Sequence, residues 1–328
     1  MSSSTALPRA RPVPARARGS LWRRIVAARW CYLFILPSLI LAAMFTFWPI
    51  VASWYFSLLD FSGFTTERPF VGLDNYRELI QDRYFWGAFA HSFLFAAVTV
   101  PIRLVLALIV AMVLNDRAFR AAPLFRTVFF LPVVSTTAIV GILMTFLFSP
   151  FNGPVNKVLL ALQLVAQPID FLGNPQSALW TVMLVQIWKN FGFSMIYWLA
   201  ALQSIPPELY EAARVDGATG AQQFRAITAP LLRPFAVVIL LVTVVSTLRV
   251  FDLVQTMTGG GPFFASEVVE TYIYRNAFSS QGGIPREGYA SAVGVFFGLA
   301  VMLIALLQGW AVRRANSVRQ SLESRGAV

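Results

Sequence analysis

The sequence predicts an all-α integral membrane protein with six transmembrane helices. Of its 328 residues, 57% are hydrophobic and 12% are charged, whereas soluble domains average about one quarter charged residues. Several apolar runs reach the roughly 20 residues that a helix needs to cross a bilayer. Arginines gather in the short segments between these runs, where positive charge marks the cytoplasmic side. We therefore interpret the formal net charge of +11 as a signal of orientation in the lipid bilayer and expect no nucleic-acid partner.

Residues 1–29 are predicted to form a disordered, basic cytoplasmic tail. This stretch carries seven arginines and no acidic residue, and it has too little apolar surface to fold alone. The apolar run at 30–58 is too long for the hydrophobic region of a signal peptide. It therefore predicts the first transmembrane helix in preference to a cleaved leader.

Five further apolar runs follow, and the charge of the intervening segments alternates. The segment 60–85 is rich in acids and aromatics and is placed outside, whereas 115–126 holds three arginines and is placed inside. A transmembrane domain of residues 30–314 and a cytoplasmic tail of residues 315–328 result, with both chain termini inside. The predicted spans are 30–58, 88–114, 127–148, 178–202, 235–257 and 289–312, and the segment 203–234 faces the cytoplasm.

Ionisable residues inside membrane spans are costly and therefore informative. Lys189 falls in the fourth span and Arg249 and Asp252 in the fifth. Arg249 and Asp252 lie three residues apart, so on a continuous helix they could pair. With the neighbouring Gln186, Trp188 and Asn190, these residues either line a hydrated path for a hydroxylated solute or pack structurally. Their spacing leaves both interpretations open.

The sequence contains few groups of residues that could form an enzyme active site. His91 is the only histidine and Cys31 the only cysteine, so an internal disulfide is impossible, a cysteine metal cluster is excluded, and we expect no metal site. No GxxxxGK[ST] loop is present, so the chain should not hydrolyse ATP itself. We expect His91 to be an interfacial or packed residue and the protein not to be an enzyme.

The polar segment 203–234 has the pattern of helix, turn and helix. Pro206 and Pro207 favour a helix start, and Gly217 favours its end. A second helix is expected from Ala221 to Ala229, stopping before Pro230. From spacing alone, the segment is either a coupling element for another protein or an ordinary amphipathic surface loop.

The same segment carries a recognisable motif. Glu211, Ala212 and Ala213, followed by Gly217 and then by Ile227 and Pro230, resemble the EAA motif of the permease subunits of bacterial binding-protein-dependent ABC importers. Ala229 departs from the usual leucine before the proline. Further stretches resemble the carbohydrate-uptake branch: GLDNYREL at 72–79, RTVFFLPVV at 126–134, RVFDLVQTMTGGGP at 249–262 and TYIYRNAF at 271–278.

The resemblance implies a six-helix permease bundle with a cytoplasmic coupling helix in the bacterial inner (plasma) membrane. The expected partners are a second homologous permease, an ATPase dimer that holds ATP and magnesium, and an extracytoplasmic solute-binding protein. Glu211 would form a salt bridge to the ATPase, with Ala212, Ala213 and Gly217 as close-packing positions. The expected cargo is a disaccharide, an oligosaccharide or a related polyol compound, and this chain would need no cofactor of its own.

Two other classes of protein compete with this interpretation. An ion-driven secondary transporter would take up its solute independently of any ATPase, and its cytoplasmic segment would be dispensable. An integral-membrane enzyme is disfavoured because His and carboxylate residues do not cluster in the spans.

Overall fold

The computed structural model describes residues 28–63, 67–116, 119–278 and 284–325. The predicted tail 1–29 lies outside the described residues except for its last two positions. Within the described ranges every named element is a helix, and one isolated bridge joins Leu59 to Phe70. The elements are α2 (Arg29–Ala42), η1 (Ala43–Phe47), α3 (Trp48–Phe56), α4 (Asp74–Gln81), α5 (Arg83–Asn115), α6 (Ala122–Val134), α7 (Thr137–Leu147), α8 (Pro154–Ala161), α9 (Ala178–Gln203), α10 (Pro207–Val215), α11 (Gly220–Gln223), η2 (Phe224–Thr228), α12 (Ala229–Thr247), α13 (Phe251–Met257), α14 (Val269–Phe278) and α15 (Glu287–Arg325).

The chain divides into two units, Met1–Ala52 and Ser53–Val328. In the first unit, α2 and η1 bury no side chain. They continue into α3 to give an apolar stretch of 28 residues, Arg29–Phe56. Such a length can cross a bilayer, and a largely apolar exposed surface suits contact with lipid.

In the part of the chain that the structure describes, four helical stretches are long and apolar enough to cross a membrane, or five if the bent pair α6 and α7 counts as one. The four are Arg29–Phe56, Arg83–Asn115, Gly220–Thr247 and Glu287–Trp310. The 26-residue helix α9 is not among them, because Gln186, Lys189 and Asn190 lower its mean hydropathy. The chain is therefore a multi-pass helical membrane protein, and the count of six spans stays a prediction.

Two predicted spans are broken in the structure. The span expected at 127–148 is split into α6 and α7, which meet at an angle of 97°, because Ser135 and Thr136 take extended backbone conformations. The span expected at 235–257 ends as α12 at Thr247 and resumes as α13 at Phe251. Both breaks lie next to polar residues. The apolar runs alone predict continuous helices at these positions.

Two predicted helix ends also differ from the structure. The cytoplasmic helix expected to stop at Ala229 runs on through Pro230 into α12, because the π-helical turn η2 directly before it shifts the hydrogen-bond pattern that a proline would otherwise interrupt. The last predicted span, 289–312, is part of α15, which continues to Arg325.

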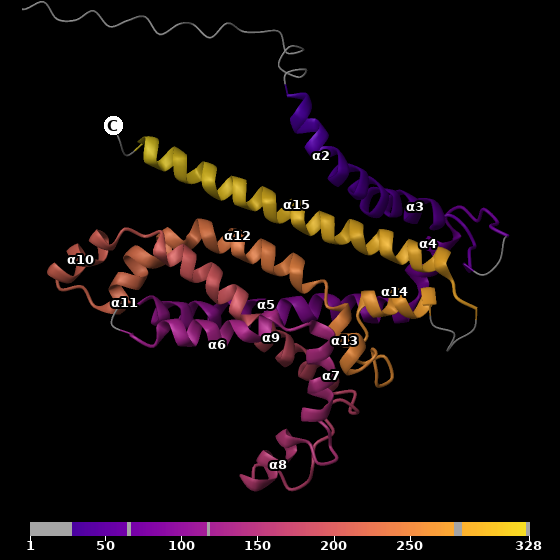
Figure 1. Cartoon of the computed structure of the whole chain (residues 1–328), viewed down its shortest axis with the longest axis horizontal. Helices are drawn as coiled ribbons and strands as arrows, with labels where there is room; N and C mark the ends of the chain where they lie inside the picture. Colours follow the sequence, from indigo (N-terminus) through magenta and orange to yellow (C-terminus); the bar gives the residue numbers. More distant parts are fainter. Residues whose placement is uncertain (1–27, 64–66, 117–118, 279–283, 326–328) are drawn as a thin grey trace, which may run out of the picture. The chain divides into compact units, whose positions relative to one another are not determined.

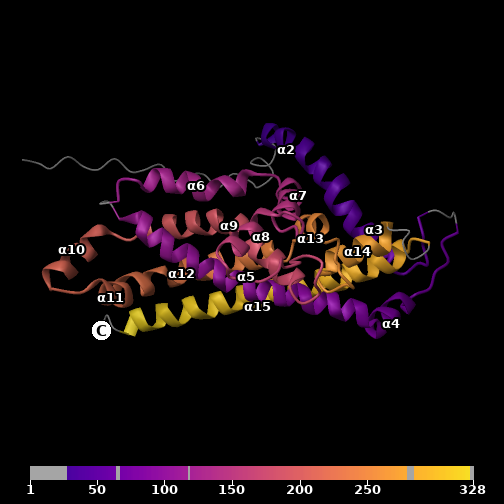
Figure 2. The same cartoon turned by 90° about the horizontal axis from the view of Figure 1, so that it is seen from below.

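In the second unit, α5 and α9 form the centre of the bundle and pack along each other. Figures 1 and 2 show α6, α9, α5 and α12 running side by side. A glycine, Gly192 in α9, faces the backbone of Phe129 in α6, so closely that a Cβ would overlap the carbonyl oxygen. Three buried clusters fill the bundle, between α5, α9 and α12, between α5, α7, α9 and α13, and between α4, α5, α14 and α15.

The helices α4 and α14 lie at one end of this unit, whereas α10 and α11 lie at the other, as both views show (Figures 1 and 2). At the α4 end, Asp82 caps α5 through the N–H groups of Tyr84 and Phe85. The hydroxyls of Tyr272 and Tyr289 also donate to Asp82 Oδ2. Burial alone would raise the pKa of Asp82, but these hydrogen bonds hold it below its ordinary value.

Candidate functional site

The predicted coupling segment forms the short exposed helix α10. Pro206 takes the N-cap position and Pro207 begins the helix, as the proline pair indicates. Gly217 ends it with a φ of +75°, a left-handed conformation that glycine adopts without steric cost. The N–H of Ala218 donates to the Ala213 carbonyl at 2.9 Å. The turn after α10 is therefore closed by its own backbone, without help from a partner.

The four residues of the predicted coupling motif share this helix and its turn. Glu211, Ala212 and Gly217 are exposed, and Ala213 is half-buried. No atom lies within 4 Å of the position a Cβ would take on Gly217. Their surface is thus open for another protein to approach closely.

One hydrogen bond joins α10 to the bundle, and a capping box orders the start of the next helix. The hydroxyl of Tyr210 lies 2.9 Å from Oγ1 of Thr228 in η2, and Thr228 is buried. Across the following turn, Thr219 and Gln222 form a reciprocal capping box at the start of α11, a pattern that satisfies two orphan donors. Because η2 continues directly into α12, α10 is connected to a membrane-spanning helix through Tyr210.

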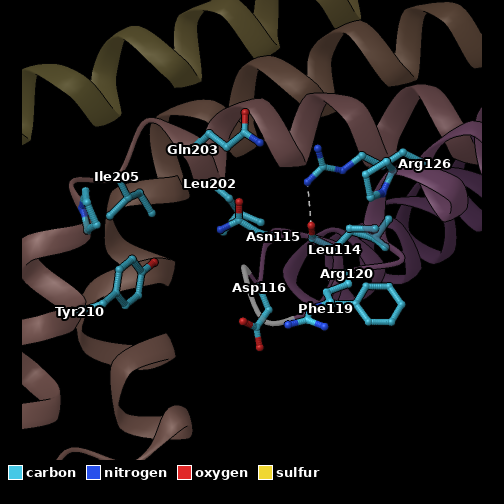
Figure 3. Close-up of a pocket in the computed structure, with 13 residues that line it drawn as sticks. Leu114, Asn115, Asp116, Phe119, Arg120, Arg126, Leu202, Gln203, Ile205 and Tyr210 are labelled. Carbon is cyan, nitrogen blue, oxygen red and sulfur yellow. Dashed lines mark hydrogen bonds between the residues drawn. The ribbon is translucent and has the colours of Figure 1, made fainter.

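Two adjoining cavities separate α10 from the end of α5. The first, of about 570 Å³, lies between the turn after α5 and the junction of α9 with α10 (Figure 3). Inside it, the Arg126 guanidinium donates to the Leu114 carbonyl at 2.7 Å. The second, of about 700 Å³, is lined by Glu211 and Arg214 among others. The inner face of α10 is therefore loosely packed.

The intramembrane candidates do not all come together. Gln186 and Lys189 are buried in α9, and the Asn190 amide donates to the Gln186 carbonyl at 3.3 Å. Trp188 points elsewhere: it is 47% exposed and lines an apolar groove of about 370 Å³ with residues of α5 and α6. Lys189 is within electrostatic range of Asp252 in α13. Lys189 and Asp252 thus lie on two helices that contact each other, and Trp188 stands apart from them.

The expected pair of Arg249 and Asp252 is wrong. Arg249 lies in the break between α12 and α13, so the two residues are not on neighbouring turns of one helix. Both side chains are exposed in this chain, and none of the ion pairs found among the described residues joins them. Both charges lie within electrostatic range of a residue that the sequence did not single out, Glu270 of α14.

Two further residues, one of them the single histidine, have definite places. Arg103 is buried in α5 and donates to Thr247 Oγ1 at 3.1 Å, at the end of α12. His91 is half-buried, with Nδ1 lying 3.0 Å from the Glu267 carbonyl oxygen, a packed position of the kind expected. Sequence reasoning missed Tyr210, Thr228 and Glu270, because each acts through a partner at least 18 residues away.

The chain is similar to known transport proteins along most of its length. It is 35% identical over 299 residues to the lactose transport system permease protein LacF of Rhizobium radiobacter, covering 90% of this chain and 98% of that one. It is 35% identical over 231 residues to the trehalose/maltose transport system permease protein MalF of Thermococcus litoralis, covering 70% and 77%.

A solved structure shows the same fold. It is a chain of a bacterial ABC transporter involved in the import of the acidic polysaccharide alginate, with a TM-score of 0.78 and 27% identity. The match covers 90% of this chain and 98% of that one. The profile described as "Binding-protein-dependent transport system inner membrane component" matches residues 103–317. With its exposed α10 and its helical bundle, the chain belongs to this family of ABC transporter permeases.

Proposed function

We propose that this chain is the permease subunit of an ATP-driven sugar importer, and that α10 receives the movement of a partner ATPase. The observation that carries the proposal is the exposure of Glu211, Ala212 and Gly217 on a helix clamped to α12 by Tyr210 and Thr228. The relatives that transport lactose and trehalose or maltose support a sugar or polyol compound as cargo.

The proposed assembly contains this chain, a second homologous permease, two ATPase subunits and an extracytoplasmic solute-binding protein. A structure similar to this chain is a bacterial alginate ABC transporter in complex with a substrate-bound periplasmic protein, which supports such a partner. We place α10 and both chain termini in the cytoplasm. The separation of α10 from α4 and α14 (Figure 2) and the basic segment 115–126 support this orientation.

In the proposed mechanism, ATP binding closes the ATPase dimer and displaces α10 as a rigid body. Tyr210 and Thr228 pass the displacement to α12, and the bundle changes between inward-open and outward-open states. Gln186, Lys189, Asn190, Arg249 and Asp252 are the proposed lining of the pathway, because they supply hydrogen-bonding groups inside an otherwise apolar bundle. Trp188 would belong to the lining only if a partner subunit closed its groove.

The test reverses one charge on α10. Glu211→Lys should reduce both co-purification of the ATPase with the tagged chain and ATP-dependent sugar uptake by at least about tenfold, since a like-charge contact replaces an attractive one. The matched control is Glu208→Lys, an exposed acid in the first turn of the same helix, which should preserve both. Normal assembly and uptake in Glu211→Lys would reject the coupling role, and uptake that persists without any ATPase would support an ion-driven transporter instead.

A further inference from the structure

The short helix α13 lacks an N-cap of its own. The N-cap position is Val250, whose side chain accepts no hydrogen bond, whereas Ser, Thr, Asp and Asn are the residues that usually satisfy the first N–H groups of a helix. The preceding helix α12 has already ended at Thr247. The first amides of α13 therefore need an acceptor from elsewhere in the chain.

That acceptor is a carboxylate from a different helix. Oε2 of Glu270, in the first turn of α14, accepts the Phe251 N–H at 2.7 Å. A negative charge at this end of α13 is favoured by the helix dipole as well as by the hydrogen bond. Glu270 thus supplies from 19 residues away the cap that Val250 cannot supply.

The same carboxylate lies near the charged residues of the proposed pathway. Glu270 is in electrostatic range of Arg249 and Asp252, and Asp252 in turn is in range of the buried Lys189. A buried cation inside a bundle is strongly destabilised when its compensating charge moves away. The direction in which α13 points therefore decides whether Lys189 keeps its compensating charge.

The other end of α13 is held separately. Thr256 packs against Gly141 of α7 so tightly that a Cβ on Gly141 would overlap its side chain, and Leu253 and Val254 are fully buried. Loss of Glu270 would therefore free the beginning of α13 while its remainder stays packed. This arrangement makes a variant at position 270 a local perturbation.

We infer that Glu270 is a positioning residue of the translocation pathway, which fixes α13 so that Asp252 faces Lys189 and Arg249 faces the solute. The inference rests on the proposed transport function. It also couples the loop helix α14 to the pathway, since a displacement of α14 moves the cap of α13. Glu270 itself need not touch the solute.

The experiment measures the cap and the transport separately, on the full chain assembled with its partner subunits. Hydrogen–deuterium exchange of residues 248–257 in lipid nanodiscs reports the cap, and uptake of radiolabelled lactose, trehalose and maltose in cells reports transport. Glu270→Ala should accelerate exchange of the first α13 amides about tenfold, the effect of losing a typical N-cap, and should lower uptake at least fivefold. Glu270→Gln keeps one acceptor oxygen, so it should restore most of the exchange protection.

The matched control is Glu267→Gln, three residues earlier. Glu267 is buried, and its carboxylate pairs with Arg275, with an Nε–Oε1 distance of 2.8 Å. It should leave exchange at 248–257 unchanged. Unchanged exchange in Glu270→Ala, an equal rise in Glu267→Gln, or normal uptake despite faster exchange would each overturn the positioning role. The unmodified complex could take up none of these sugars while Glu270→Ala still accelerates exchange of the α13 amides. That result would reject the proposed cargo and support the capping of α13 by Glu270.

Discussion

Tyr210 of α10 and Thr228 of η2 are joined by a hydrogen bond of 2.9 Å between their hydroxyls. This bond links an exposed helix to a membrane span, and Thr228 is almost completely buried. If α10 transmits movement, Tyr210→Phe should weaken transmission without disturbing the surface of α10. A single hydrogen bond contributes about 1 kcal/mol, so we expect uptake to fall about fivefold while the complex still assembles.

The control for this prediction is Tyr197→Phe. Tyr197 is an exposed tyrosine of α9 stacked on Phe193, and its hydroxyl should be dispensable. Uptake per assembled complex is the quantity to compare. An equal loss in both variants would mean that Tyr210 has no special part in transmission.

Gly217 provides a second prediction, because its backbone has a positive φ and its surroundings are open. Gly217→Val should destabilise the turn by about 1–2 kcal/mol, since a β-branched residue resists this conformation. Gly217→Asn should be milder because asparagine tolerates it. Co-purification of the ATPase should follow the order Gly, Asn, Val. Gly220→Ala in the next helix, where a Cβ also meets open space, should have little effect.

Close packing between α6 and α9 gives a third prediction. A Cβ on Gly192 would overlap the Phe129 carbonyl oxygen, whereas one on Gly298 in α15 meets nothing within 4 Å. Gly192→Leu should therefore lower the unfolding temperature of the detergent-solubilised protein by several degrees, consistent with an overpacking cost of about 1–3 kcal/mol. Gly298→Leu should leave that temperature nearly unchanged. Equal stability of the two variants would contradict the close helix contact.

The ion pair between Glu78 and Arg286 sets a pH dependence. The Arg286 guanidinium, hydrogen-bonded at 2.5 and 2.6 Å, holds the pKa of Glu78 below its ordinary value. A lowered carboxyl pKa adds stability above the unfolded pKa of about 4.3, and this stability is lost as the pH falls through the folded value. Glu78→Gln should therefore flatten the unfolding temperature between about pH 5 and pH 3, and Arg286→Gln should do the same.

The orientation can be tested with the single cysteine of the chain. In a Cys31→Ser background, Ala212→Cys and Phe151→Cys place one exposed thiol in α10 or in the loop before α8. A membrane-impermeant maleimide should label Phe151→Cys in intact spheroplasts and Ala212→Cys only after permeabilisation. The reverse pattern would invert the proposed topology.

The backbone preferences of individual residues made much of the structure of the coupling segment predictable. Proline and glycine restrict the backbone at the residues themselves, so the ends of α10 at Pro207 and Gly217 could be read from the sequence. The fourth predicted span, 178–202, matches α9 within one residue, because its apolar residues are continuous on both sides of Lys189.

The breaks in two spans were not predictable in this way. Arg249 is the single charged residue between Leu248 and Val250, and the group that stabilises a new helix start there belongs to Glu270 in another element. Likewise, Ser135 and Thr136 are compatible with a helix, and only the packing of α7 against α13 favours the bend. Side-chain pairs such as Tyr210 and Thr228 depend on how the helices pack against each other. The hydropathy pattern of the sequence does not specify that packing.

The uninterrupted run from Gly220 to Thr247 has a mechanical consequence. Its 28 residues form a rod about 42 Å long at about 1.5 Å per residue, so a tilt of about 5° at its base displaces the far end by about 4 Å. That far end is Thr247, which accepts a hydrogen bond from Arg103. A shift of this size exceeds the range of any hydrogen bond. A small rotation near α10 would thus separate a buried cation near the middle of α5 from its hydrogen-bond partner. This separation would give the resting tilt an energetic preference of its own.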